Sequence, residues 1–135
     1  MTDPDLVLKK LALIDTCLRA LRTRARPQDL EDDFEHRAFV ERTLQVAIQA
    51  AIDAGAHVVS DENLGEPATS RELFTLLARA GWIGAPLARS LERMVGFRNV
   101  LVHGYDAIDL EIVRRALQEG LGDLETFVGA MRARL

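Results

Sequence analysis

Residues 94–106 read MVGFRNVLVHGYD, and this stretch decides how the rest of the chain is interpreted. Its apolar residues keep helical spacing, and Gly104 is well placed to end the helix. Four polar or aromatic side chains lie within the eight residues 98–105, namely Arg98, Asn99, His103 and Tyr105. Such residues either complete a helix end, where cations suit the negative pole of the helix dipole, or act chemically on an anionic group.

Helix geometry limits how Arg98 and His103 can act together. Five residues at about 100° each place the two positions about 140° apart on an ideal helix. They meet only if the helix unwinds near His103, as Gly104 would permit, or if a second copy of the chain brings its own pair across a two-fold axis. Both arrangements predict a cleft at the C-terminal end of this helix, lined by arginine and histidine.

The rest of the chain predicts helices and turns, and no segment has a convincing strand pattern. Asp3 and Pro4 suit the start of a first helix, which Pro27 ends or restarts. Further helices are expected over residues 27–59, 70–81 and 86–102, and from residue 109 onward. Thr69 with Glu72 fits a capping box for the helix over residues 70–81, and Asp109 could cap the last helix. We therefore predict an all-α fold, an antiparallel bundle of about five helices in a single domain over residues 1–135. Long helices in a short chain leave broad apolar faces, so we also expect a homodimer or higher assembly.

Composition and charge limit the classes of protein to which this chain could belong. The chain has 135 residues, is 48% hydrophobic, and carries a net charge of −4. This balance argues against a broad, non-specific nucleic-acid binder, although a local basic cleft remains compatible with it. Cys17 is the one cysteine, so no disulfide forms within the chain. No apolar run is long enough to span a membrane, and the N-terminus does not resemble a signal peptide, so we expect a cytoplasmic protein.

Several other polar residues have two interpretations. Asp53 and His57 are one helical turn apart and would form either a second layer around the cleft or, more simply, a buried polar pair. Arg89 and Arg93 have the same spacing and would be either solvated arginines paired with nearby acids or a basic track for phosphates. His36 stands among acidic residues and is expected to be exposed.

Arg98, His103 and Tyr105 form the pattern R-x-x-x-x-H-x-Y, which resembles the signature of the HEPN superfamily. The stretch MVGFRNVLVHGYDAID is similar throughout to the HepT-like branch, formerly called the DUF86 family. The segments PATSRELFTLLARAGWI and AIDAGAHVV also resemble that branch, and the resemblance covers nearly the whole chain.

The resemblance implies a small, all-helical, dimeric protein. Many members of this family are metal-independent endoribonuclease toxins that act on RNA such as tRNA or mRNA. Their usual partner is a minimal nucleotidyltransferase antitoxin, which neutralises the toxin by attaching AMP to the motif tyrosine, here Tyr105. No metal and no cofactor is implied.

Cleavage of RNA without a metal uses the 2′-hydroxyl of the substrate as nucleophile. The reaction needs a base, an acid and a cation for the charge that develops on phosphorus. His103 can transfer protons near neutral pH, and Arg98 can clamp phosphate oxygens with its planar fork of donors. We assign Asn99 and Arg93 to contacts with the RNA phosphates. The expected products carry a 2′,3′-cyclic phosphate and a 5′-hydroxyl.

Two other functions remain open at this point. The chain could be a non-catalytic helical subunit that binds a nucleotidyltransferase, because fold alone does not give function. It could also be a regulatory protein that binds RNA without cutting it. The presence of both Arg98 and His103 favours the nuclease, since a scaffold has no need of the pair.

Overall fold

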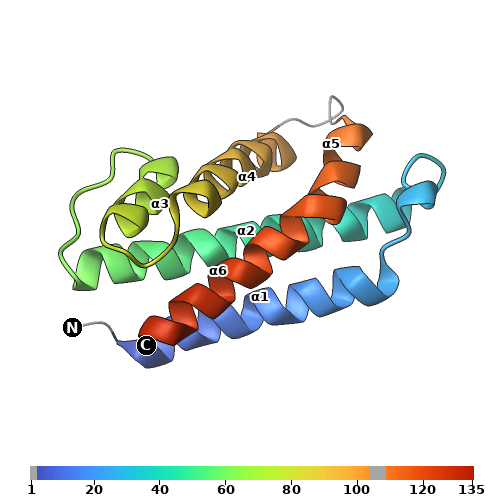
Figure 1. The fold of residues 1–135 in the computed structure, drawn as a ribbon. Coiled ribbons are helices and arrows are strands. Elements are labelled where there is room, and N and C mark those ends of the chain that lie inside the picture. Colours follow the sequence, from blue (N-terminus) through green and yellow to red (C-terminus); the bar gives the residue numbers. More distant parts are fainter. Residues whose placement is uncertain (1–2, 104–108) are drawn as a thin grey trace.

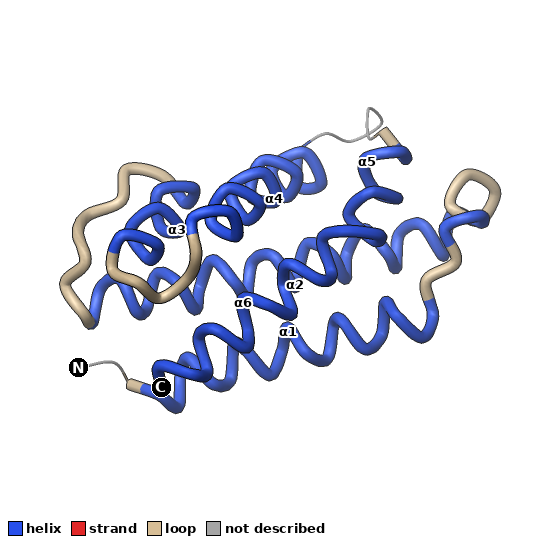
Figure 2. The backbone as a smooth tube through the Cα atoms, in the orientation of Figure 1, coloured by secondary structure: helices blue, strands red, loops and turns tan. Residues whose placement is uncertain are grey.

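A computed structural model describes residues 3–103 and 109–135, and it is helical throughout its regular elements. The element order is α1 (Pro4–Arg24), the short 3₁₀ turn η1 (Pro27–Asp29), α2 (Phe34–Asp61), α3 (Ser70–Arg79), α4 (Ala85–His103), α5 (Leu110–Arg115), the π-helical turn η3 (Ala116–Gly120) and α6 (Leu121–Arg134). No strand occurs in the part that is described (Figure 2). The predicted all-α class is confirmed.

The long helices run in alternating directions, as the bundle prediction requires (Figure 1). α1 packs chiefly along α2, α3 and α4 pack on each other and on α2, and α6 lies against α1, α2 and α4. The core between them is apolar. Phe74 of α3 and Phe127 of α6 meet edge to face at its centre, with ring centroids 6.0 Å apart. No helix among residues 3–103 and 109–135 has the length and apolar character needed to cross a membrane.

Side-chain caps fix most helix starts. Asp3 accepts a hydrogen bond from the amide of Asp5 at the start of α1, and Asp109 accepts one from the amide of Glu111 at the start of α5. Thr69 caps α3 by accepting from the amide of Glu72. These three starts agree with the sequence, because each places a short oxygen acceptor where the first amides of a helix need a partner.

The start of α2 differs from the prediction. We expected a helix from Pro27, but α2 begins at Phe34, capped by Asp33, and residues 27–29 form a separate 3₁₀ turn. His36 is buried, with 8% of its surface exposed, so the expectation of an exposed residue is wrong. Its Nε2 accepts a hydrogen bond of 2.8 Å from the amide of Arg26, which ties the link between α1 and α2 to the side of α2.

The C-terminal segment, which we call the α5–α6 rod, was predicted as one helix from residue 109. It is continuous in Figure 1, but η3 interrupts its α-helical pattern between α5 and α6. Gly120 in this turn is buried against α4, where an added Cβ would lie 3.0 Å from Cε of Met94. The π turn therefore lies at the contact with the helix that carries the motif.

Candidate functional site

The motif occupies the last turns of α4. Arg98 and Asn99 lie within this helix, and His103 is its final residue. The side chain of His103 and the whole of Tyr105 lie outside the described residues. The structure therefore places the side chains of Arg98 and Asn99 and the backbone of His103.

The course of α4 bears on the two ways in which Arg98 and His103 could meet. α4 stays helical through His103, so it does not unwind before that residue. On a helix of ordinary geometry the two positions are then about 140° apart, on different sides of α4. Unwinding at Gly104 would fall outside the described residues, and the other arrangement is a second copy that brings its own arginine or histidine.

Arg98 is partly buried, and its Nε is shielded from solvent without a hydrogen-bond acceptor among the described residues. A buried, unpaired donor costs about 1–3 kcal/mol, and such groups are rare in folded proteins. The helix-end interpretation predicts a guanidinium bonded to the last carbonyls of α4. Nε of Arg98 makes no such bond among the described residues, and it is a buried donor without a partner there.

Asn99 and Arg93 are both exposed. Asn99 makes no hydrogen bond with the described residues, and the turn that it could hold instead of a phosphate lies outside them. Arg93 donates to Oγ of Ser90 at 3.1 Å and has no carboxylate within 4.0 Å among the described residues. Arg89 likewise has no such ion pair, so neither arginine directly contacts an acid as one interpretation expected, although both are exposed as it also expected and Arg93 acts electrostatically on Asp123. Both guanidinium groups remain available to an anion.

Apolar side chains surround the polar residues at this end of α4. Val100 of α4 and Ile112 of α5 are 41% and 42% exposed. A hollow of about 190 Å³ lies between α4 and the α5–α6 rod, with Phe97, Ile112 and Asp123 among its lining residues. Burial raises the pKa of the Asp123 carboxyl, and the nearby Arg93 partly offsets this rise. The site thus combines cations with exposed apolar surface, which suits a contact between molecules.

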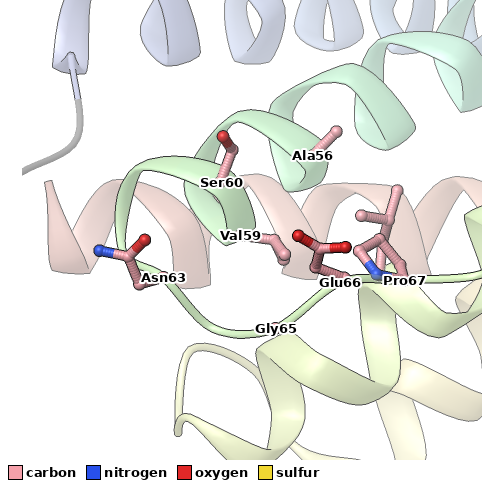
Figure 3. A pocket seen from close by; sticks show the side chains of 8 residues that line it. Ala56, Val59, Ser60, Asn63, Gly65, Glu66 and Pro67 are labelled. Carbon is pink, nitrogen blue, oxygen red and sulfur yellow. The ribbon is translucent and has the colours of Figure 1, made fainter.

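A separate hollow of about 560 Å³ contains none of the predicted site residues. It lies at the far end of α2, where Ala56, Val59 and Ser60 face Glu66 and Pro67 of the following loop (Figure 3). This is the opposite end of the bundle from the C-terminus of α4 (Figure 1). We assign no chemistry to it.

The expected pairing of Asp53 with His57 is wrong. Asp53 is partly exposed and bonds to Lys10 at 3.3 Å and to Gln49 at 2.9 Å, while His57 lies 3.7 Å from Asp61. Each side chain therefore has a nearer partner than the other. Among the residues that the structure describes, no three His, Cys, Asp or Glu side chains gather closely enough to hold a metal ion.

Arg71 is a cation beside α4 that the sequence did not connect with this helix. It comes from α3, yet its guanidinium lies against the backbone of α4 at Gly96. No spacing rule links residues so far apart in the chain, so the contact depends on how α3 packs on α4.

An all-helical bundle with Arg98, Asn99 and His103 at the end of one long helix defines a HEPN-type protein. The family model described as "Ribonuclease HepT-like" matches residues 14–131. The chain belongs to this family, and the resemblance inferred from the sequence is confirmed.

Similar proteins agree with this assignment. The chain is 35% identical to the mRNA nuclease HepT of Shewanella oneidensis, over 96% of this chain and 98% of that protein. It is 32% identical to the tRNA nuclease HepT of Aphanizomenon flos-aquae, over 93% of this chain and 87% of that protein. Among solved structures, the tri-AMPylated HEPN toxin of Shewanella oneidensis in complex with the MNT antitoxin superposes with a TM-score of 0.88 at 34% identity, covering 98% of this chain and 99% of that one.

Proposed function

We propose that this chain is the endoribonuclease toxin of a toxin–antitoxin pair and that it cuts RNA, a tRNA or an mRNA, in the cytoplasm without a metal ion. Its family and its similarity to two HepT nucleases support the activity. The observation on this chain that carries the proposal is the buried Nε of Arg98, a donor without an acceptor on the helix that ends at His103.

The reaction follows from the two residue types. A base removes the proton of the RNA 2′-hydroxyl, the O2′–P bond forms, and the P–O5′ bond breaks as an acid protonates the leaving oxygen. We assign both proton transfers to His103, one copy acting as base and the other as acid. Arg98 holds the non-bridging oxygens and stabilises the charge that develops on them. Asn99 and Arg93 bind further phosphates of the same RNA strand.

A dimer completes the site. Since α4 keeps positions 98 and 103 on different sides within one chain, a two-fold axis near the end of α4 would bring Arg98 of one copy toward His103 of the other. The exposed Val100 and Ile112 would then be covered by the second copy. Two imidazoles and two guanidiniums in one cleft supply an acid, a base and a phosphate clamp.

We further propose that a minimal nucleotidyltransferase is the antitoxin and that it adenylylates Tyr105. The phenol oxygen would attack the α-phosphate of ATP, and pyrophosphate would leave. The attached AMP would bring bulk and negative charge close to His103 in sequence, opposing RNA by the same electrostatics as a phosphorylation switch. The structure of the Shewanella oneidensis HEPN toxin, which is tri-AMPylated and bound to an MNT antitoxin, supports this proposal.

Cleavage in a chelator tests the activity. Purified protein, shown by intact mass to be unmodified at Tyr105, is incubated with bulk tRNA and mRNA in EDTA beside Arg98→Ala, His103→Ala and the control Arg79→Ala. Arg79 is exposed on α3 and outside the motif. We expect cleavage with 2′,3′-cyclic phosphate ends by the parent and the control, and a loss of at least about a hundredfold in the other two.

Two results would contradict the proposal. Cleavage by the parent that stops in EDTA would exclude the metal-independent reaction. No cleavage by unmodified, dimeric parent would favour the non-catalytic subunit that binds a nucleotidyltransferase. For the antitoxin step, Tyr105→Phe should cut RNA but should not be silenced by the nucleotidyltransferase and ATP. Silencing of this variant would exclude Tyr105 as the modified residue.

A further inference from the structure

A second cluster of cations lies between α3 and α4, apart from Arg98. Arg71, Arg89, Glu92 and Arg93 line an open hollow of about 480 Å³, which we call the arginine cleft. Three guanidinium groups and one carboxylate meet there, in a chain whose net charge is −4. The cleft is therefore a local departure from the acidic character of the molecule, and it attracts anions.

None of the three guanidinium groups has a carboxylate within 4.0 Å among the described residues, although Arg93 lies near enough to Asp123 to lower the pKa of its carboxyl. Arg71 and Arg89 make no hydrogen bond or ion pair within the described part of the chain, and Arg93 bonds there to the neutral Ser90. Glu92 is already engaged, because Oγ1 of Thr75 donates to it at 2.6 Å and so ties α3 to α4. Arginines elsewhere contrast with these, as shown by the ion pairs Arg22–Glu125, Arg26–Asp29, Arg114–Glu31 and Arg132–Asp15. The positive charge of the cleft is therefore not neutralised by a direct ion pair among the described residues.

Gly96 makes the position of Arg71 possible. A Cβ atom added at Gly96 would lie 2.7 Å from Nη2 of Arg71, closer than two such atoms can approach. The guanidinium lies over the surface of α4 only because the glycine has no side chain. A larger residue would force the guanidinium of Arg71 to shift from its position over Gly96. Because Arg71 is a flexible, exposed side chain, it could move without disturbing the core.

The cleft lies on the same side of α4 as position 103. Gly96 precedes His103 by seven residues, which is about two turns and returns to within about 20° of the same direction. Arg93 precedes it by ten residues, or about 15 Å along the helix axis at about 1.5 Å per residue. A nucleic-acid strand held at the end of α4 can therefore continue along this side of the helix and reach the cleft.

We infer that the arginine cleft binds a backbone phosphate of the RNA substrate, a few nucleotides from the cut, with Arg71 of α3 closing the cleft over α4. This inference rests on the proposed function, because it takes the bound strand to be the substrate. RNA fits better than an acidic protein surface, since a strand leaving the end of α4 carries a phosphate at every nucleotide along its path. Planar guanidinium forks match phosphate oxygens in pairs.

Binding across a range of salt concentrations tests the inference. A fluorescent single-stranded RNA of mixed sequence is titrated with His103→Ala protein, which does not consume it, and with the same protein carrying Arg71→Ala, Gly96→Ala or both. Arg79→Ala is the matched control, an exposed arginine of the same helix outside the cleft. Size-exclusion chromatography confirms that every variant keeps the oligomeric state of its parent.

We expect Arg71→Ala to weaken binding about twofold to fivefold. It should also lower the slope of log affinity against log salt by about 0.7, the value for one phosphate contact on a single strand. Gly96→Ala should give the same loss while every charge is retained, and it should fold well because alanine favours a helix by about 1 kcal/mol. The double variant should be no worse than either single variant, since both remove one contact. Arg79→Ala should leave the slope unchanged.

Cleavage assays separate this inference from the proposed function. With His103 present, Arg71→Ala and Gly96→Ala should raise KM for a long RNA, while all variants cut a dinucleotide at the parental rate because it cannot reach the cleft. If the parent cuts no RNA but Arg71→Ala still lowers the slope of log affinity against log salt, the proposed nuclease activity is wrong and the phosphate site is retained. If the parent cuts RNA and both variants bind and cut as it does, the inference is wrong. It is also wrong if RNA binding is unchanged and only affinity for the nucleotidyltransferase falls.

Discussion

At the scale of single residues, His36 illustrates how one polar side chain fixes a connection. It is buried near the start of α2, its ring lies 5.9 Å from the ring of Phe39, and its Nε2 accepts from the amide of Arg26. The amide of Arg26 belongs to no helix, so this hydrogen bond provides its partner. The sequence around His36 is acidic and hid this role, because the partner amide is ten residues away.

His36→Ala should lower the free energy of unfolding by about 1–3 kcal/mol, because it removes both a buried ring and the acceptor for the amide of Arg26. Urea denaturation followed by circular dichroism measures the change. His57→Ala is the control, since His57 is partly exposed and its pairing with Asp61 contributes at most about 1 kcal/mol. Equal losses in the two variants would show that the hydrogen bond from Arg26 does not stabilise the fold.

Asp123 gives a prediction that depends on pH. Burial raises the pKa of its carboxyl in the folded protein. The ionised form is therefore disfavoured by folding, so this residue lowers stability at neutral pH. The penalty disappears as the pH falls through the raised pKa toward the unfolded value of about 3.9. Asp123→Asn should raise the Tm at pH 7 and have little effect near pH 4.

Thermal unfolding of Asp123→Asn at both pH values measures this effect. Asp32→Asn is a suitable control, because Asp32 is exposed and makes no ion pair within the described residues. If Asp123→Asn unfolds at a lower temperature than the parent at pH 7, attraction between Asp123 and Arg93 outweighs the burial of the carboxyl.

At the scale of helices, two glycines differ in whether another helix packs against them. Gly55 of α2 is buried against α3, where an added Cβ would lie 3.2 Å from Cδ1 of Leu77. Gly129 of α6 is exposed, and a Cβ there would meet nothing within 4 Å. The same residue type therefore serves two purposes. Gly55 permits close packing of two helices, whereas Gly129 weakens its helix without a compensating contact.

Opposite effects are expected at these two positions. Gly55→Leu should lower the free energy of unfolding by about 1–3 kcal/mol or more, because it overpacks the contact between α2 and α3. Gly129→Ala should raise it by up to about 1 kcal/mol through helix propensity. Denaturant titration measures both. A Gly55→Leu protein as stable as its parent would show that α2 and α3 can separate without cost.

Helix ends were easier to predict than interruptions within helices. Asp3, Thr69 and Asp109 were legible as caps because a cap depends on residues within one turn. The start of α2 was misplaced because Pro27 offers a plausible helix start, and only tertiary contacts of His36 select Asp33 instead. The π turn at residues 116–120 was not predicted, since it places Gly120 against Met94 of another helix.

At the scale of the whole molecule, we predict a dimer formed through the end of α4. Val100 and Ile112 are exposed apolar residues beside the motif, and α4 does not bring positions 98 and 103 together within one chain. Replacing both by Glu (Val100→Glu with Ile112→Glu) should convert the dimer to a monomer and abolish RNA cleavage, because charges are costly to bury in an interface. Analytical ultracentrifugation gives the mass relative to the 15.0 kDa chain.

Leu8→Glu provides the control for this experiment. Leu8 is an exposed apolar residue of α1, and α1 and α4 lie at opposite edges of the bundle (Figure 1). This variant should remain dimeric and active. A monomeric parent that still cuts RNA would show that one chain alone completes the site.

The sequence by itself determined the helical class, the order and approximate bounds of the helices, and the family, because these depend on local spacing and on a short motif at residues 98–105. Tertiary structure decided which side chains are free. It showed that Nε of Arg98 is buried without an acceptor among the described residues, that His36 is buried, and that Arg71 of α3 reaches Gly96 of α4. These properties arise from packing between residues distant in the chain, which local sequence patterns do not encode.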